Sequence, residues 1–162
     1  MPVLRVRDAV ETDVALVAQL IRALAQYEKL EADCVIRETD LAAHLFGTRP
    51  YAEALIGEID GEPQGYALYF HTYSTFAGRP GLWLEDLFVR PDARGGGLGR
   101  ALLAEVARRA VERGCARLEW SVLDWNAPAI RFYEAIGAAQ KPEWIINRLT
   151  GEALRQLAAG AA

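Results

Sequence analysis

The N-terminal part of the chain carries a strand-like hydrophobic pattern followed by a helix-like one. Apolar and charged side chains alternate over residues 3–7, as they do in the edge strand of a sheet. Apolar side chains then recur at helical spacing from Val14 to Leu24, behind Thr12 or Asp13, and both of these residue types suit a helix N-cap. The pattern predicts a short strand and then an amphipathic helix.

A hairpin is predicted further along. A second, shorter helix is expected to begin at Thr39-Asp40 and to end near Gly47. The dipeptide Asp60-Gly61 is a strong short-range hairpin signal, because both residue types accept the left-handed backbone of a tight turn. It separates two strand-like segments, residues 52–59 and 64–74.

The second half of the chain alternates strands with helices. The expected order is a loop (75–81), a strand (82–90), a glycine-rich loop (92–99), a helix (98–113), a strand (117–123), a helix (128–137), a strand (145–149) and a C-terminal helix. Gly114 and Gly137 are expected to end the two helices that precede them. Hairpins followed by strand–helix alternation predict an α/β fold, with a single mixed sheet, mostly antiparallel, and helices on both faces.

Composition is that of a folded domain. The chain has 162 residues, of which 52% are hydrophobic and 25% charged, and we expect residues 1–162 to form one domain. A membrane span needs about 20 consecutive apolar residues, and no stretch approaches this, so no membrane partner is expected. Arg5, Arg7 and Asp8 stand where a secretory signal would be apolar, so the expected location is cytoplasmic.

Charge and side-chain chemistry exclude further classes of function. A net charge of −4 argues against a nucleic-acid partner, because such modules usually carry a basic excess. His44 and His71 have no cysteine or carboxylate at ligand spacing, so no metal is expected. Cys34 and Cys115 lack a Cys-x-x-Cys spacing and are expected to be free thiols.

The glycine-rich loop is the most informative segment. Three adjacent glycines lie between Arg94 and Leu98, after a predicted strand and before a predicted helix. Their backbone amides can turn toward an anion, and the helix N-terminus adds partial positive charge, so a phosphate or pyrophosphate site is predicted. A P-loop would need Lys-Ser/Thr after Gly99, where Arg100 stands, and the dinucleotide fingerprint also fails. The alternative is a flexible surface loop.

Four motifs in order resemble those of one enzyme family. They are Leu-Ala-Gln-Tyr-Glu at 24–28, Leu-Glu-Asp-Leu-Phe-Val at 84–89, Arg-Gly-Gly-Gly-Leu-Gly at 94–99 and Asp-Trp-Asn-Ala-Pro-Ala-Ile-Arg-Phe-Tyr at 124–133. Together they resemble the GNAT superfamily of N-acetyltransferases, in particular the branch of spermidine/spermine and thialysine acetyltransferases. The resemblance runs from about Val3 to Trp144. It implies the GNAT fold, in which the sheet opens in a central V-shaped splay for acetyl-CoA.

The resemblance also implies how acetyl-CoA, the expected acetyl donor, would bind. The pyrophosphate would contact the loop formed by Arg94, Gly95, Gly96, Gly97, Leu98, Gly99 and Arg100. The pantetheine arm would pair with the strand at Leu87, Phe88 and Val89. Asn126, Ala129 and Tyr133 would contact the cofactor from the other side.

Catalytic and acceptor residues follow from the same resemblance. Tyr133 would be the general acid that protonates the coenzyme A sulfur, since a phenol stays protonated at neutral pH. Glu85 would assist deprotonation of the amine, through water. The acceptor pocket would be formed by Tyr27, Glu28, Glu85, Asp86 and Trp144. In a regular strand Asp86 would point to the face opposite Glu85, so only one of the two would face the substrate.

The expected reaction is direct transfer of the acetyl group to a small primary amine in a ternary complex. Residues 73–76 and 122–126, together with Lys29, are similar to the thialysine enzymes, so a diamine, polyamine or lysine-like amino acid is the expected acceptor. Two alternatives stay open: a non-catalytic acyl-CoA-binding or regulatory module on the same fold, and a protein or peptide acetyltransferase. The resemblance implies a homodimer.

Overall fold

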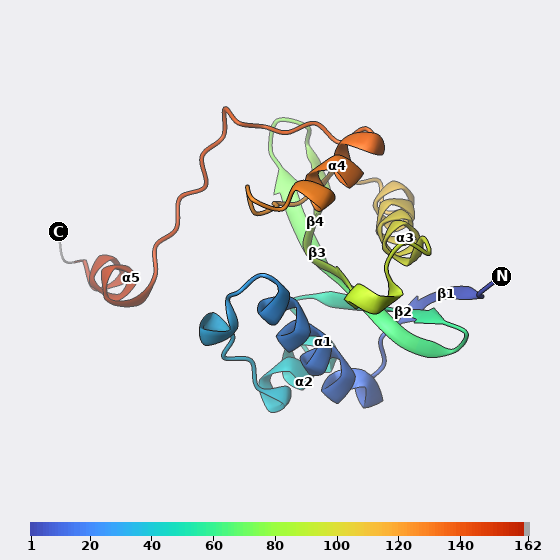
Figure 1. Cartoon of the computed structure of the whole chain (residues 1–162). Helices are drawn as coiled ribbons and strands as arrows, with labels where there is room; N and C mark the ends of the chain where they lie inside the picture. Colours follow the sequence, from blue (N-terminus) through green and yellow to red (C-terminus); the bar gives the residue numbers. More distant parts are fainter. Residues whose placement is uncertain (161–162) are drawn as a thin grey trace. The chain divides into compact units, whose positions relative to one another are not determined.

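The computed structural model describes residues 1–160 (Figure 1). The chain divides into two compact units, Met1–Ser121 and Val122–Ala162. The first unit holds the whole sheet and three of the helices. That residues 1–162 form one domain stays a prediction.

The first unit is built on a five-stranded sheet in the order β1-β2-β3-β4-β5. The strands are β1 (Leu4–Asp8), β2 (Glu53–Ile59), β3 (Glu62–Ser74), β4 (Arg79–Val89) and β5 (Leu118–Glu119). The first four pair antiparallel and β5 pairs parallel with β4, which confirms the mixed, mostly antiparallel sheet. The β2–β3 turn is the predicted hairpin: Asp60 and Gly61 have φ values of 52° and 85°, as a type I′ turn requires.

Helices α1 (Val14–Tyr27) and α2 (Glu38–Phe46) cover one face of the sheet (Figure 1). The buried core on this face is formed by Val17, Ala18 and Leu20 of α1, Leu41 and Leu45 of α2, and Ile56, Tyr66 and Phe88 of the strands. Helix α2 begins one residue earlier than predicted, after Arg37, and Thr39 and Asp40 lie in its first turn. Arg37 supplies the reason: its Nε lies 2.7 Å from Asp40 Oδ2, so the carboxylate pairs with a guanidinium instead of capping the helix.

Three short 3₁₀ turns connect these elements, η1 (Glu11–Asp13), η2 (Glu31–Asp33) and η3 (Pro91–Ala93). Asp13 is the N-cap residue of α1, as one of the two predicted possibilities had it, but its carboxylate makes no capping bond to α1. It accepts from the Val10 N–H and from Arg7 instead. These bonds hold the pKa of Asp13 below its usual range, the Arg7 hydrogen bond most of all.

Helix α3 (Leu98–Glu112) covers the opposite face and packs closely at its N-terminal end. A Cβ at Gly57 of β2 would lie 2.9 Å from Leu98 Cδ1, so the absence of a side chain lets the helix approach the sheet. Gly57 faces Gly65 of β3 in the register, and a Cβ at Gly65 would lie 2.5 Å from the Phe88 carbonyl oxygen. These two glycines set how closely the first turn of α3 and β4 approach the middle of the sheet.

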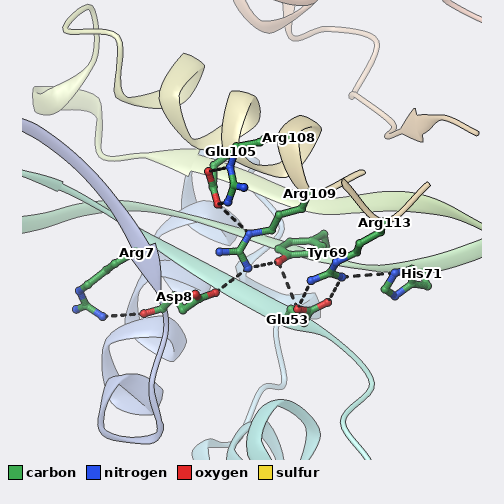
Figure 2. A network of polar contacts seen from close by, with 9 residues as sticks. All are labelled: Arg7, Asp8, Glu53, Tyr69, His71, Glu105, Arg108, Arg109 and Arg113. Carbon is green, nitrogen blue, oxygen red and sulfur yellow. Dashed lines mark hydrogen bonds and ion pairs between the residues drawn. The ribbon is translucent and has the colours of Figure 1, made fainter. Parts of the chain in front are cut away.

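Charged side chains fix the other end of α3 (Figure 2). Arg109 donates to Asp8 Oδ1 at 2.7 Å, to the Tyr69 hydroxyl at 2.8 Å and to Glu105 Oε1 at 3.0 Å. Arg113 donates to both carboxylate oxygens of Glu53, at 2.6 and 2.8 Å. The Arg109 side chain is 14% exposed, so its hydrogen bonds are less screened by water than those of fully exposed ion pairs, whose usual contribution is below about 1 kcal/mol.

The second unit contains α4 (Ala127–Ala135) and α5 (Gly151–Ala158). Both helices were predicted, and Gly137, with φ of 90°, follows the end of α4 as expected. The predicted strand over residues 145–149 is wrong: that segment has no regular structure, and Ile145 and Ile146 are 82% and 70% exposed. A strand needs a neighbouring strand for its backbone groups, and none is paired with this segment in the part of the chain that the structure describes. The strand predicted over 117–123 is likewise reduced to the two residues of β5.

Candidate active site

Strand β4 has different partners along its two edges. One edge pairs with β3 from Arg79 to Val89, but β5 pairs with Leu82 and Trp83 alone. Beyond Trp83, therefore, β4 has no strand on its second edge within the described residues, as the expected splay of the sheet requires. Just after the end of β4, the Arg90 N–H donates to the carbonyl oxygen of Gln64 in β3.

Alternation along the strand then decides which way the last amides of β4 point. Since the Arg90 N–H faces β3, the N–H of Phe88 faces β3 as well, and those of Leu87 and Val89 face the second edge. The Val89 carbonyl faces that edge too, and it accepts a hydrogen bond from Arg94 Nε at 2.9 Å. Leu87 and Val89 thus present backbone groups to which an extended molecule can pair.

A β-bulge interrupts β4 at Glu85. Asp86 faces Leu68 of β3 and Leu84 faces Tyr69, so Glu85 is the extra residue with no partner across the ladder. The expectation that Glu85 and Asp86 point to opposite faces assumed a regular strand, and the bulge removes that alternation. Glu85 is exposed and accepts a hydrogen bond from Trp83 Nε1 at 2.9 Å.

The glycine-rich loop joins η3 to α3. Gly95 and Gly97 have φ values of 85° and 90°, which side-chain-bearing residues rarely adopt, and Gly97 is the N-cap residue of α3. A Cβ built at Gly95 or Gly96 would meet no atom within 4 Å, so backbone here is accessible to a ligand. Leu98 is 1% exposed and anchors the loop in the core, and a Cβ built at Gly99 would lie 3.7 Å from Val89 Cγ2. The first amides of α3 have no carbonyl partner within the helix and can bind an anion.

Arg94 connects this loop to the end of α1. Its guanidinium carbon lies 4.2 Å from the centre of the Tyr27 ring and 5.7 Å from that of Phe88. A stacking contact of this kind holds the planar cation over the aromatic faces. The structure thus brings together Tyr27 and Arg94, which the sequence assigned to the acceptor side and the cofactor side. Arg100, the second arginine assigned to the loop, is exposed in the first turn of α3.

A group of carboxylates lies where β4 meets the end of α1. Asp86 Oδ2 accepts a hydrogen bond from the Tyr66 hydroxyl at 2.8 Å. Burial raises the pKa of Asp86 from its ordinary 3.8 to about 6, and the charges of Glu85 and Glu28 act in the same direction, while the Tyr66 hydrogen bond lowers it. Burial also raises the pKa of Glu28.

Among the described residues, none of the ion pairs involves Glu28, Glu85 or Asp86. Uncompensated carboxylates that are partly withdrawn from water favour binding of a cation. The arrangement is suited to an organic ammonium.

The remaining predicted residues belong to the second unit. Asn126 is the N-cap residue of α4, and its Oδ1 accepts from the Ala129 N–H at 3.4 Å. Tyr133 lies on the same helix, partly buried, with its ring 5.4 Å from that of Phe132. Trp144 is 77% exposed. The structure groups the first three of these residues on one short helix.

Tyr66 is the residue that sequence reasoning missed. Its side chain is fully buried, and its hydroxyl carries the hydrogen bond to Asp86. In the sequence, Tyr66 looks like any aromatic residue in a strand. The one available signal was its hydroxyl, since a buried tyrosine needs a polar partner.

Comparison with known proteins identifies the class. A family model described as the acetyltransferase (GNAT) family matches residues 19–138. The chain belongs to the GNAT family and is an N-acetyltransferase, as the four motifs predicted. No helix in residues 1–160 is long and apolar enough to cross a membrane. Nor do three or more His, Cys, Asp or Glu side chains gather there as a metal site would need.

Particular relatives cover the chain almost completely. A thialysine N-epsilon-acetyltransferase of Bos taurus is 42% identical over 98% of this chain and 99% of its own length. An L-ornithine N5-acetyltransferase of Arabidopsis thaliana is 31% identical over 94% of this chain and 87% of its own. Among solved structures, an integron cassette protein from the mobile metagenome of V. cholerae is 26% identical, with a TM-score of 0.80 over 96% of this chain and 97% of its own.

We expect Asp86→Asn to stabilise the fold at neutral pH. A raised pKa means that ionisation of Asp86 opposes folding, so its stabilising contribution is complete below pH 3.8 and is lost as the pH rises through about 6. Asparagine keeps an acceptor for Tyr66 without the charge. The free energy of unfolding should rise at pH 7.5 by on the order of 2 kcal/mol, and the gain should vanish near pH 4.

Urea denaturation of both proteins at the two pH values measures this difference. Asp33→Asn, which removes an exposed carboxylate on η2, is the matched control and should change the midpoint little at either pH. A lower midpoint for Asp86→Asn than for the native protein at pH 7.5 would contradict the expectation.

Proposed function

We propose that this enzyme transfers the acetyl group of acetyl-CoA directly to the primary amine of a small molecule, in a ternary complex. The observation that carries the proposal is the position of β4. One strand presents backbone groups at Leu87 and Val89, leads toward the glycine loop, and carries Glu85 and Asp86. A donor site and an acceptor site are thus built on adjacent residues of the same strand.

The donor site fits coenzyme A by its chemistry. Gly95, Gly96 and Gly97 leave room for close approach to the backbone, and the amides at the start of α3 suit a pyrophosphate. The N–H groups of Leu87 and Val89 would pair with the amides of the pantetheine arm, with Phe88 buried behind them. One of these N–H groups would polarise the thioester carbonyl as negative charge develops on its oxygen. In this proposal Asn126, Ala129 and Tyr133 contact the donor from α4.

The acceptor site would bind the amine through Glu28 and Asp86. Glu85 would take the ammonium proton through a water molecule, because a protonated amine has no electron pair for attack. The amine nitrogen then forms a bond to the thioester carbon, the carbon–sulfur bond breaks, and Tyr133 gives its phenolic proton to the sulfur. The nitrogen of the new amide loses its second proton to water, and the Tyr133 phenolate takes a proton back from solvent. Trp144 and Tyr27 would line the pocket, although Arg94 stacks on the Tyr27 ring.

The names of the relatives support a small, basic acceptor. Proteins named for thialysine and L-ornithine acetylation share 42% and 31% of their aligned residues with this chain. Both names describe an amino acid with a terminal side-chain amine, and we propose an acceptor of that kind or a diamine. We also propose that the enzyme is a cytoplasmic homodimer. The group formed by Glu28, Glu85 and Asp86 supports a cationic amine as the acceptor, and it would have no purpose in a module that binds acyl-CoA without catalysis.

An acceptor panel tests this proposal. Release of free thiol from acetyl-CoA should be followed with thialysine, lysine, ornithine, putrescine, spermidine and a generic peptide. We expect turnover on at least one of the small amines, and a fall of at least about 100-fold in kcat for Tyr133→Phe, since general-acid catalysis contributes 10²–10⁴-fold. Phe132→Leu, beside it on α4, is the control and should keep most of its activity.

Two outcomes would contradict the proposal. Turnover confined to the peptide would favour a protein acetyltransferase. Tight binding of acetyl-CoA without turnover on any acceptor would favour a binding module.

Gly96→Ala tests the donor site separately. A Cβ at this position meets no protein atom within 4 Å, so the variant should fold normally. The methyl group would stand where the pyrophosphate approaches, so KM for acetyl-CoA should rise at least tenfold, with KM for the amine nearly unchanged. Gly78→Ala, at the β3–β4 turn, is the control; because Gly78 has a φ of 64°, alanine there adds backbone strain, and this variant should lose some stability but keep the native KM for acetyl-CoA. An unchanged KM for acetyl-CoA in Gly96→Ala would place the pyrophosphate elsewhere.

A further inference from the structure

We propose that Tyr66 is a positioning residue of the acceptor site, which holds the Asp86 carboxylate in place from the buried side. The inference rests on the proposed function, because it assigns Asp86 to the binding of the amine. Tyr66 itself would not touch the substrate, and it would act through its hydrogen bond to Asp86.

The geometry of Tyr66 supports this role. Its side chain is 0% exposed and belongs to the core between the sheet and α1. The ring lies 6.5 Å from that of Phe88, centre to centre. The ring is packed on all sides, so it cannot move easily. Its hydroxyl is therefore held 2.8 Å from Asp86 Oδ2. A rigid donor of this kind fixes the direction of the carboxylate that it binds.

Packing alone does not require a hydroxyl at this position. Phenylalanine would fill the same space, and it would bring no polar group that must be desolvated and then satisfied. The Tyr66 hydroxyl has Asp86 as its hydrogen-bond partner, and that residue is part of the unpaired carboxylate group. The bond therefore serves the orientation of Asp86 more than the stability of the core.

The charges around Asp86 make the hydrogen bond important for its ionisation. Tyr66 faces it from β3, Glu85 is the bulged residue just before it on β4, and Glu28 lies at the end of α1. Both carboxylates oppose a further negative charge, and burial opposes it more strongly. The Tyr66 hydrogen bond is the one interaction among these that lowers the pKa of Asp86. Without it, a larger fraction of Asp86 would be protonated near neutral pH, and the carboxyl group would bind an ammonium more weakly.

Tyr66→Phe and Tyr69→Phe form a matched pair for the test. Both tyrosines are fully buried on β3, but the Tyr69 hydroxyl bonds to Arg109 on the α3 face. For Tyr66→Phe we expect the acid limb of kcat/KM for the amine to move up by about one pH unit. At pH 6.5 its KM for the amine should rise about threefold, because the ionised fraction of Asp86 falls by about that factor when its pKa moves from about 6 to about 7, and KM for acetyl-CoA should change less than twofold. Tyr69→Phe should leave the acid limb where it is in the native enzyme.

A titration without substrate separates this inference from the proposed function. The side-chain carbon of Asp86, followed by ¹³C NMR in the native protein and in Tyr66→Phe, should titrate about one pH unit higher in the variant. Equal titration in the two proteins, or equal acid limbs for the two tyrosine variants, would overturn the positioning role. If the native enzyme acetylates no amine, the proposed function fails and the acceptor role of Asp86 fails with it, whatever the titration shows. In an Asp86→Asn background, Tyr66→Phe should have no further effect on the pH profile.

Discussion

The unequal pairing of strand β4 is the constraint on which the site depends. Its first edge is held by β3 along the whole strand, whereas its second edge has a partner at Leu82 and Trp83 alone. Pairing with β3 along the first edge makes the strand rigid. On the second edge, the N–H groups of Leu87 and Val89 point away from β3. The bulge at Glu85 lies between these two parts of the strand. A rigid strand with one free edge can hold a donor molecule and a carboxylate in a fixed relation, which catalysis by proximity requires.

Helix α3 determines where the phosphate loop lies relative to that strand. Gly57 lets Leu98 pack directly on the sheet, and Arg109 and Arg113 fix the far end of the helix by bonds to β1, β2 and β3. The helix therefore cannot slide along the sheet without losing either close packing or several partly buried hydrogen bonds. Its N-terminus stays beside the end of β4, where a Cβ built at Gly99 would lie 3.7 Å from Val89 Cγ2.

The sequence predicted the local features of the fold better than the contacts between distant residues. The turn at Asp60-Gly61, the glycine loop and the helix that ends before Gly114 each depend on a few adjacent residues. The Tyr66–Asp86 hydrogen bond and the stacking of Arg94 on Tyr27 join residues far apart in the chain, and no spacing rule predicts them. The strand expected over 145–149 was wrong for a related reason: alternation of side chains does not supply the partner that a strand needs.

Amide hydrogen exchange at the end of β4 tests the central claim most directly. Exchange of Leu87, Phe88 and Val89 should be measured by NMR with and without saturating coenzyme A, which binds without turnover. The account predicts that exchange of Leu87 and Val89 slows at least tenfold, because their N–H groups pair with the ligand, while Phe88, which faces β3, changes little. Unchanged exchange at both Leu87 and Val89 with coenzyme A bound would contradict the claim that the free edge of β4 is the donor site.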